Sequence, residues 1–336
     1  MRKIILLSLL FLGLVSCHQK SNTPIKLNGI AQGTYYSIIY YDNEQRNFQP
    51  QIDSLLTEFD KTASLWVDRS LIQRINKNQD SIITPLFADI FNKSLEINNY
   101  TNGAFDCRVG QLVATWGFSF KHKENPTATQ IDSLLAYSQA DIYLDTNENG
   151  EIILHKQNPN TWIDFNAIAQ GYSSDLVAQW LTQQNIHDYI VDIGGEVIAH
   201  GNKPNGDHWT VGVEKPADNK YSAPEIESAI YLDNLAIVTS GNYRKYYEKD
   251  GVRYSHTINP NTGYPVEHSL LSASVIDSTS WRADALATAC MVMGLEKSIE
   301  FINSHPYPTA AYFIYDSNGT YKTYATPEFQ KLIIQK

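Results

Sequence analysis

The stretch from Thr239 to Pro265 places the strongest local constraint on how this chain can fold. It reads Thr-Ser-Gly-Asn-Tyr-Arg at positions 239–244 and Tyr-Ser-His-Thr-Ile-Asn-Pro-Asn-Thr-Gly-Tyr-Pro at positions 254–265. Proline holds φ near −65°, while asparagine and glycine accept positive φ, so positions 259–263 predict a fixed turn. Such a turn can orient His256 and its own backbone amides toward a ligand. Taken alone, a Pro/Gly turn is equally compatible with a structural role.

The N-terminal segment has the pattern of an export signal. Arg2 and Lys3 precede an apolar run from Ile4 to Val15 that is too short to span a bilayer as a mature helix. Leu-Val-Ser-Cys then ends at Cys17 and resembles a bacterial lipobox. In that interpretation Cys17 becomes the lipidated first residue; in the alternative, the signal is a plain secretory one and Cys17 is incidental.

These features divide the chain into three predicted parts. We expect a lipoprotein signal peptide over 1–16, a lipidated tether over 17–24 and a folded domain over 25–336. The predicted location is exported and lipid-anchored to a membrane, on its periplasmic or extracytoplasmic side.

Composition excludes several classes of protein. With 336 residues, 43% of them hydrophobic, the chain can build one large domain or two intimately joined ones. Its formal charge of −10 becomes −12 once Arg2 and Lys3 are removed with the signal, which makes nucleic acid an unsuitable partner. A phosphate-bearing small molecule would need a bridging cation on so acidic a protein. The remaining Cys107 and Cys290 predict buried free thiols.

Helix-spaced and strand-spaced segments are mixed along the chain, and neither a repeat nor a low-complexity block separates them. We therefore predict a mixed α+β unit with two lobes. The predicted helices cover 52–64, 86–101, 173–184 and 280–293. The predicted strands cover 24–41 with a turn at 29–34, a hairpin over 142–156, then 189–193, 197–201, 209–214, 235–238, 254–258 and 272–276, with 254–258 expected beside 235–238.

Three segments carry candidate binding chemistry. Asp164 to Tyr172 places an acidic residue and small residues before a helix, as chains do where backbone meets phosphate at a helix N-terminus. The pair Gly194-Gly195 predicts either a bulge or a close approach to a ligand. Trp66 is either a core aromatic or a ring on which a planar ligand stacks.

The helix predicted over 280–293 carries a candidate metal site. Asp284 and Thr288 stand four residues apart and therefore share one helix face. Such residues are usually solvent-facing or locally bonded, but the alanine-rich flanks of this pair predict a buried helix. A buried carboxylate needs a partner, and two oxygen ligands one turn apart suit Mg2+. The sequence contains no Walker A loop, no G-x-G-x-x-G and no zinc-ligand spacing.

Several motifs, in this order, resemble the FAD:protein FMN transferases, the ApbE-type flavin transferases formerly called thiamine-biosynthesis lipoproteins. The matching segments are Gly33-Thr34-x-Tyr36, Ser64 to Asn76, Phe105-Asp106 with Trp116-Gly117-Phe118, Asp164 to Tyr172, Ile193 to Glu196, Thr239 to Arg244, His256 to Pro265 and Ala283 to Thr288. They span nearly the whole mature chain. The resemblance implies mainly antiparallel sheets with flanking helices.

The same resemblance implies a flavin site and a magnesium site. FAD would be contacted by Gln32, Trp66, Ala104, Phe105, Asp106, Asp164, Gln170 and the backbone near Ile258, and Mg2+ would be held by the Ala167 carbonyl, Asp284 and Thr288. This chain departs from the family where Gln32 replaces a common Met, Trp66 a common Tyr, Gln170 a common Lys or Glu, and Ala287 a carboxylate that some members carry. We also expect Thr239, Ser240 and Gly241 to line the ligand turn.

The implied reaction is attack by an acceptor protein's Thr hydroxyl on the FMN-side phosphorus of FAD, which releases AMP. His256 is the candidate for proton handling, together with Asp284 as a catalytic residue, and Arg244 pairs either with phosphate or with a neighbouring carboxylate.

Three alternatives remain open at this point. A Mg2+-dependent FAD pyrophosphatase would use water as the nucleophile in the same site. A serine hydrolase would combine Ser240, His256 and Asp284, although no nucleophile-elbow sequence surrounds Ser240. A non-catalytic lipoprotein would bind ligands through its 39 aromatic residues without turnover.

Overall fold

The computed structural model describes residues 22–118, 126–215, 225–242, 246–249, 252–255, 257–304 and 309–334. Its main element is an antiparallel sheet of eight strands in the order β1-β2-β6-β7-β10-β13-β14-β15. These strands are β1 (Ile25–Ala31), β2 (Thr34–Tyr40), β6 (Tyr189–Ile193), β7 (Glu196–His200), β10 (Ala236–Gly241), β13 (Leu270–Asp277), β14 (Ala310–Ser317) and β15 (Thr320–Ala325).

Three smaller sheets complete the β structure of the described chain. They are the three-stranded sheet β3 (Ile82–Ile83), β5 (Ile152–Lys156) and β4 (Ile142–Thr146), the pair β8 (Trp209–Lys215) and β9 (Glu225–Leu232), and the pair β11 (Tyr246–Lys249) and β12 (Val252–Ser255). The predicted α+β class with mainly antiparallel sheets is confirmed.

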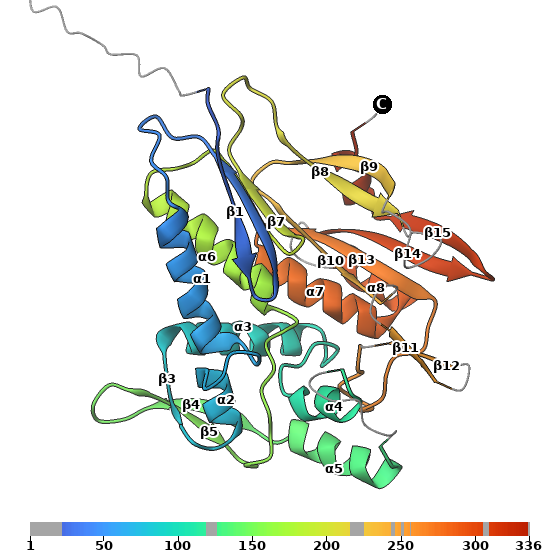
Figure 1. Ribbon diagram of the computed structural model, residues 1–336. Helices are drawn as coiled ribbons and strands as arrows, with labels where there is room; N and C mark the ends of the chain where they lie inside the picture. Colours follow the sequence, from blue (N-terminus) through green and yellow to red (C-terminus); the bar gives the residue numbers. More distant parts are fainter. Residues whose placement is uncertain are drawn as a thin grey trace, which may run out of the picture.

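Helices cover the large sheet and form a second group beside the three-stranded sheet. They are α1 (Gln49–Ala63), α2 (Leu71–Asn76), α3 (Pro85–Tyr100), α4 (Gly110–Thr115), α5 (Ala128–Ser138), α6 (Ala169–Gln183), α7 (Ser280–Met293), α8 (Leu295–Ser304) and α9 (Pro327–Leu332). Figure 1 shows α6 and α7 along the large sheet, with α2 to α5 and strands β3 to β5 grouped below them. No described helix is long and apolar enough to cross a bilayer.

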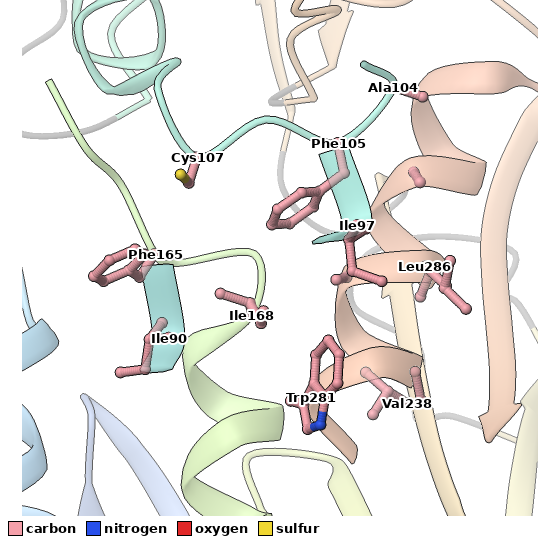
Figure 2. Close-up of a cluster of buried hydrophobic side chains, with 14 of the residues drawn as sticks. Ile90, Ile97, Ala104, Phe105, Cys107, Phe165, Ile168, Val238, Trp281 and Leu286 are labelled. Carbon is pink, nitrogen blue, oxygen red and sulfur yellow. The ribbon is translucent and has the colours of Figure 1, made fainter. Parts of the chain in front are cut away.

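Strand alternation divides the core between the two faces of the large sheet. On β10, Val238 belongs to a cluster with the α7 side chains, whereas Ile237 faces a second cluster with β8 and β9. This is the period-two pattern of a sheet covered on both faces. Figure 2 shows how the first cluster joins Trp281 and Leu286 of α7 to Ile97 of α3. The two groups of elements therefore share one continuous apolar core.

Helix α7 is buried on most of its faces, as its alanine-rich sequence predicts. It packs against β10, β13 and α6, and its bounds are those expected from the sequence. Only small side chains allow a helix to lie this close to a sheet and to another helix at once. Cys290 of this helix and Cys107 are buried free thiols, which confirms that prediction.

Four sequence expectations about local structure need correction. The predicted turn at 29–34 is shorter, because β1 and β2 form a hairpin whose loop is Gln32-Gly33. The helix expected from Ser173 begins at Ala169. Gly194-Gly195 is not a bulge but the two-residue turn of the β6–β7 hairpin, with both residues at positive φ, and the alternative of a close approach to a ligand stays a prediction because both residues line the cavity described below. Strand β12, within the segment expected beside 235–238, pairs with β11, while β10 lies between β7 and β13.

Candidate active site

A cavity of about 1070 Å³ opens where β2, the β6–β7 turn and β10 meet α6 and α7. This volume reaches the upper end of the range usual for small-molecule sites, so the cavity can take a large ligand. Every described residue of the predicted site lines it: Gln32, Trp66, Ala104, Phe105, Asp106, Asp164, Ala167, Gln170, Thr239, Ser240, Gly241, Ile258, Asp284 and Thr288. The other three predicted residues, Cys17, Arg244 and His256, lie outside the described residues.

The cavity wall is strongly acidic. Six carboxylates line it, and the described lining residues include no Lys, Arg or His. The six are Asp60, Asp106, Asp164, Asp192, Glu196 and Asp284. A ligand that carries a pyrophosphate would meet repulsion from this wall unless a cation came with it.

Asp284 is the buried carboxylate at the centre of the predicted metal site. It is 6% exposed, and its Oδ2 accepts a hydrogen bond of 3.0 Å from the backbone N–H of Gly171 on α6. Burial raises the pKa of Asp284 to about 7, against which the Gly171 bond favours the charged form. A cation beside this carboxylate would offset that burial.

The donor set around Asp284 fits a hard divalent cation. Thr288 lies one helical turn further on the same face of α7, and its Oγ1 lies 3.4 Å from the Ser240 Oγ of β10. Ala167 lines the same cavity just before α6 begins. The described residues hold no group of three His, Cys, Asp or Glu side chains with metal-site geometry. A carboxylate, a hydroxyl and a carbonyl therefore suit Mg2+, which keeps several waters, better than a transition metal.

Asp164 and Asp106 are each fixed by hydrogen bonds to nearby loop residues. The Asp164 N–H donates to the Cys107 carbonyl at 2.7 Å, and Asp164 Oδ1 accepts from the Asn166 N–H at 2.8 Å. Burial raises the pKa of Asp164. Asp106 instead forms a two-point ion pair with Arg108, whose Nη2 lies 2.7 Å from Oδ2. The charge of Asp106 is thus already compensated, which leaves it free to orient a ligand without binding the cation.

Gly171 allows a close contact between two helices, so within the segment 164–172 its own backbone is not free to approach a phosphate, whereas Ala167, Ala169 and Gln170 do line the cavity. A Cβ at this position would overlap Ser280 O and lie 2.7 Å from Asp284 Cβ. The Gly171 N–H is also already bonded to Asp284. The glycine is therefore needed because α6 and α7 touch here.

The β1–β2 turn places an unusual polar group at the cavity. Gln32 has φ of 54°, and neither its Oε1 nor its Nε2 has a hydrogen-bond partner although both atoms are buried. Its backbone N–H bonds to Asp60, whose Oδ1 is also buried without a partner. Buried polar atoms in this state are costly, so a ligand that bonds them is favoured.

Trp66 and the turn at 259–263 have the positions expected of ligand-site residues. Trp66 is 59% exposed and lines the cavity, so the core interpretation is wrong, and stacking on a planar ligand stays the prediction for this ring. The turn is fixed as predicted, with Gly263 N–H donating to the Asn259 carbonyl at 2.8 Å and Gly263 at φ 76°. The Trp116 Nε1–H donates to the Gly263 carbonyl at 2.8 Å and ties this turn to α4.

The sequence did not single out Asp60, Asp192 or the middle of β8, from Val211 to Val213, as part of the site. Asp60 is one of several acidic residues along the amphipathic α1, and Asp192 alternates with apolar residues along β6. Neither carries a local signal that separates it from a solvent-facing residue. Their place at the cavity follows from the packing of distant segments.

Comparison with known proteins places this chain and its fold among the transferases. The model of the ApbE family matches residues 32–313. The FAD:protein FMN transferase of Haemophilus influenzae is 34% identical over 334 residues, covering 96% of this chain and 94% of that protein. The solved flavin transferase ApbE from Vibrio cholerae has a TM-score of 0.78 at 31% identity, covering 92% of this chain and 99% of that one.

A further solved structure, the apo form of the Pseudomonas stutzeri flavinyl transferase ApbE, has a TM-score of 0.80 at 29% identity and covers 95% of this chain and 98% of that one. The chain is therefore an enzyme of the transferase class. It belongs to the ApbE family of FAD:protein FMN transferases. This membership confirms the resemblance found in the sequence, and it sets aside the serine-hydrolase and non-catalytic alternatives.

Proposed function

We propose that this protein transfers FMN from FAD to a threonine hydroxyl of an acceptor protein in a Mg2+-dependent reaction. The observation that carries the proposal is the convergence of the 14 described residues predicted from the family motifs on one acidic cavity. A charge pattern of this kind suits a pyrophosphate only when it is bound together with a cation.

The proposed reaction exchanges the phosphoanhydride bond of FAD for a phosphoester bond to the acceptor. The acceptor Thr oxygen bonds to the FMN-side phosphorus of FAD, the bond between that phosphorus and the bridging oxygen breaks, and AMP leaves with that oxygen. The Thr hydroxyl loses its proton. Bound Mg2+ would supply neutralisation of the charge that develops on the pyrophosphate oxygens.

The chain's own residues would bind the cation, orient the flavin and handle the proton. Asp284, Thr288 and the Ala167 carbonyl would hold the cation, and the hydrogen bond from Gly171 fixes the orientation of the Asp284 carboxylate. Trp66 offers an exposed ring for the isoalloxazine, and Ile258 and Phe105 offer apolar wall. We assign proton handling to His256, because imidazole titrates near neutral pH. In the sequence, His256 comes directly after β12 and three residues before the 259–263 turn.

We propose that the enzyme acts outside the cytoplasm, attached to a membrane through lipidated Cys17. The lipobox-like sequence before Cys17 supports this, and the polar stretch after it would place the domain beside membrane-bound acceptors. Detergent partitioning tests the anchor: the mature wild type enters the detergent phase, and Cys17→Ala remains aqueous. Equal partitioning of the two would refute lipidation.

A single incubation separates transfer from the remaining alternative, FAD hydrolysis. Purified protein is mixed with FAD and Mg2+, with and without a peptide that carries an acceptor Thr, and FMN, AMP and labelled peptide are quantified. The proposal expects AMP and FMN-labelled peptide in equal amounts, and loss of both in EDTA or in Asp284→Ala. Release of free FMN with no labelled peptide would establish a pyrophosphatase instead.

A further inference from the structure

Helices α6 and α7 cap each other's N-termini through a pair of carboxylates. The Asp175 carboxylate of α6 accepts hydrogen bonds from the first two N–H groups of α7, with Oδ1 3.0 Å from Ser280 N and Oδ2 2.8 Å from Trp281 N. In return, Asp284 of α7 accepts a bond of 3.0 Å from Gly171 N in the first turn of α6. Each helix thus supplies the acidic cap that the other requires.

Neither helix has a cap of its own. The residue before α6 is Ile168, which has no side-chain acceptor, and the Thr279 side chain before α7 makes no cap bond. Thr279 Oγ1 is in fact buried without a hydrogen-bond partner. The N–H groups of Ser280, Trp281 and Gly171 are therefore satisfied by the reciprocal carboxylates, while the Ala169 N–H at the start of α6 bonds to the Phe165 carbonyl at 2.8 Å.

The spacing of the four residues makes the arrangement rigid. Gly171 and Asp175 are four apart on α6, and Ser280 and Asp284 are four apart on α7, so each pair shares one helix face. Gly171 of α6 and Ser280 of α7 are in direct contact, because a Cβ on Gly171 would overlap Ser280 O. The two helices are fixed both along their axes and in their separation.

This contact sets the relative position of the candidate metal ligands. Ala167 lies two residues before the start of α6, and Asp284 and Thr288 lie on α7, so the three oxygens converge only if the two helices keep their register. Asp175 is not among the residues that line the cavity. Its effect on the site must pass through the helices that it joins.

We propose that Asp175 is a positioning residue for the metal site: by capping α7 from α6, it holds Asp284 and Thr288 in register with Ala167. The inference rests on the proposed function, because it takes the cation at Asp284 as given. Residues that orient metal ligands change metal affinity by about 10- to 100-fold when they are replaced. We expect Asp175→Asn to weaken metal binding by about tenfold, because an amide keeps one acceptor oxygen and turns an N–H donor toward an N–H of α7.

Mn2+ binding followed by electron paramagnetic resonance tests this without any turnover. The full mature chain is titrated with Mn2+ as wild type, Asp175→Asn, Asp284→Ala and Thr84→Ala. Thr84 is the matched control, because it caps α3 through Phe87 N, far from the metal ligands in sequence, and its loss weakens a helix cap of the same kind. Circular dichroism and thermal unfolding are recorded for each variant.

The expected result is an Mn2+ dissociation constant raised about tenfold by Asp175→Asn and unchanged by Thr84→Ala, at similar helix content. Asp175→Glu provides a second variant that keeps the charge and displaces the caps by one methylene, and it should weaken Mn2+ binding as well. FMN transfer by either variant should recover at high Mg2+, with the KM for FAD close to that of the wild type.

Two outcomes overturn the inference, and they differ in what else they overturn. If the wild type binds Mn2+ through Asp284 and both Asp175 variants bind it equally well, Asp175 has only a structural role and the proposed function stands. If the wild type binds no Mn2+, the metal site of the proposed function falls together with the inference.

Discussion

Replacing Gly171 with alanine should separate α6 from α7 and weaken both the fold and the site. A methyl group there would lie 2.7 Å from Asp284 Cβ and 2.8 Å from Ser280 C, whereas ordinary contact begins at 3.4 Å. The helices must therefore move apart by at least 0.7 Å, the difference between 3.4 and 2.7 Å. Because two of the obstructing atoms belong to the Ser280 backbone, no side-chain rotation can relieve the overlap.

The expected loss follows from three contributions. Overpacking of this kind costs about 1–3 kcal/mol, and the strained Asp284–Gly171 hydrogen bond adds about 1 kcal/mol. Alanine is intrinsically preferred over glycine in a helix by about 1 kcal/mol, which offsets part of this. The net destabilisation is about 1–3 kcal/mol, a large fraction of the stability of an ordinary domain.

Urea unfolding and Mg2+ titration of FMN transfer measure the two consequences together. Gly171→Ala should unfold at a lower urea concentration and require more Mg2+ for half-maximal transfer. Gln179→Ala, on the exposed face of the same helix, is the control and should change neither. A Gly171→Ala protein as stable as the wild type, with unchanged Mg2+ dependence, would refute the argument that helix contact explains this glycine.

Three further predictions concern the pH dependence of stability, Gln32 and His256. In metal-free protein, burial raises the pKa values of Asp175 and Asp284 to about 7 from an ordinary 3.8, so the folded state binds more protons than the unfolded state between these values. The free energy of unfolding measured with urea should therefore fall by on the order of 1–2 kcal/mol as pH rises from about 5.5 to 7.5, and Mg2+ should reduce this dependence; a free energy of unfolding that rises with pH contradicts it. Gln32→Met removes two buried polar atoms without partners, so it should raise the melting temperature of the ligand-free protein. The same change should weaken FAD binding, measured by flavin fluorescence. If neither value changes, Gln32 is not a ligand-binding residue. His256→Ala should abolish transfer while FAD still binds, whereas lost FAD binding with a normal rate at saturation would show that His256 has a different role.

The sequence predicted much of the fold because its helices carry strong local signals. Apolar spacing defined α1 and α3 to within a few residues, and the composition of α7 defined both its bounds and its burial. The pairing of strands was harder to predict, because partners are chosen by tertiary packing. Strand β12 pairs with β11, and the Asp250-Gly251 pair between them in the sequence is a hairpin signal that the expectation of pairing with 235–238 overlooked.

The site was predicted from ordered motifs, but its supporting residues were not. Motif residues such as Asp284 and Trp66 do line one cavity, as expected. Asp175 and Asp60 act through atoms that lie far away in sequence: Asp175 bonds to residues more than 100 positions later, and Asp60 bonds to the β1–β2 turn. Gly171 was attributed to a phosphate because a glycine near a helix start fits that role, whereas its actual neighbour is another helix.

Mass spectrometry of a co-expressed candidate acceptor tests the central claim most directly. The proposed function predicts an acceptor whose mass increases by one FMN phosphoester on a single Thr, and it predicts no increase when that Thr is replaced by Val or when the enzyme carries Asp284→Ala. An acceptor that stays unmodified while the same enzyme, in the presence of Mg2+, hydrolyses FAD with water to free FMN and AMP would contradict it.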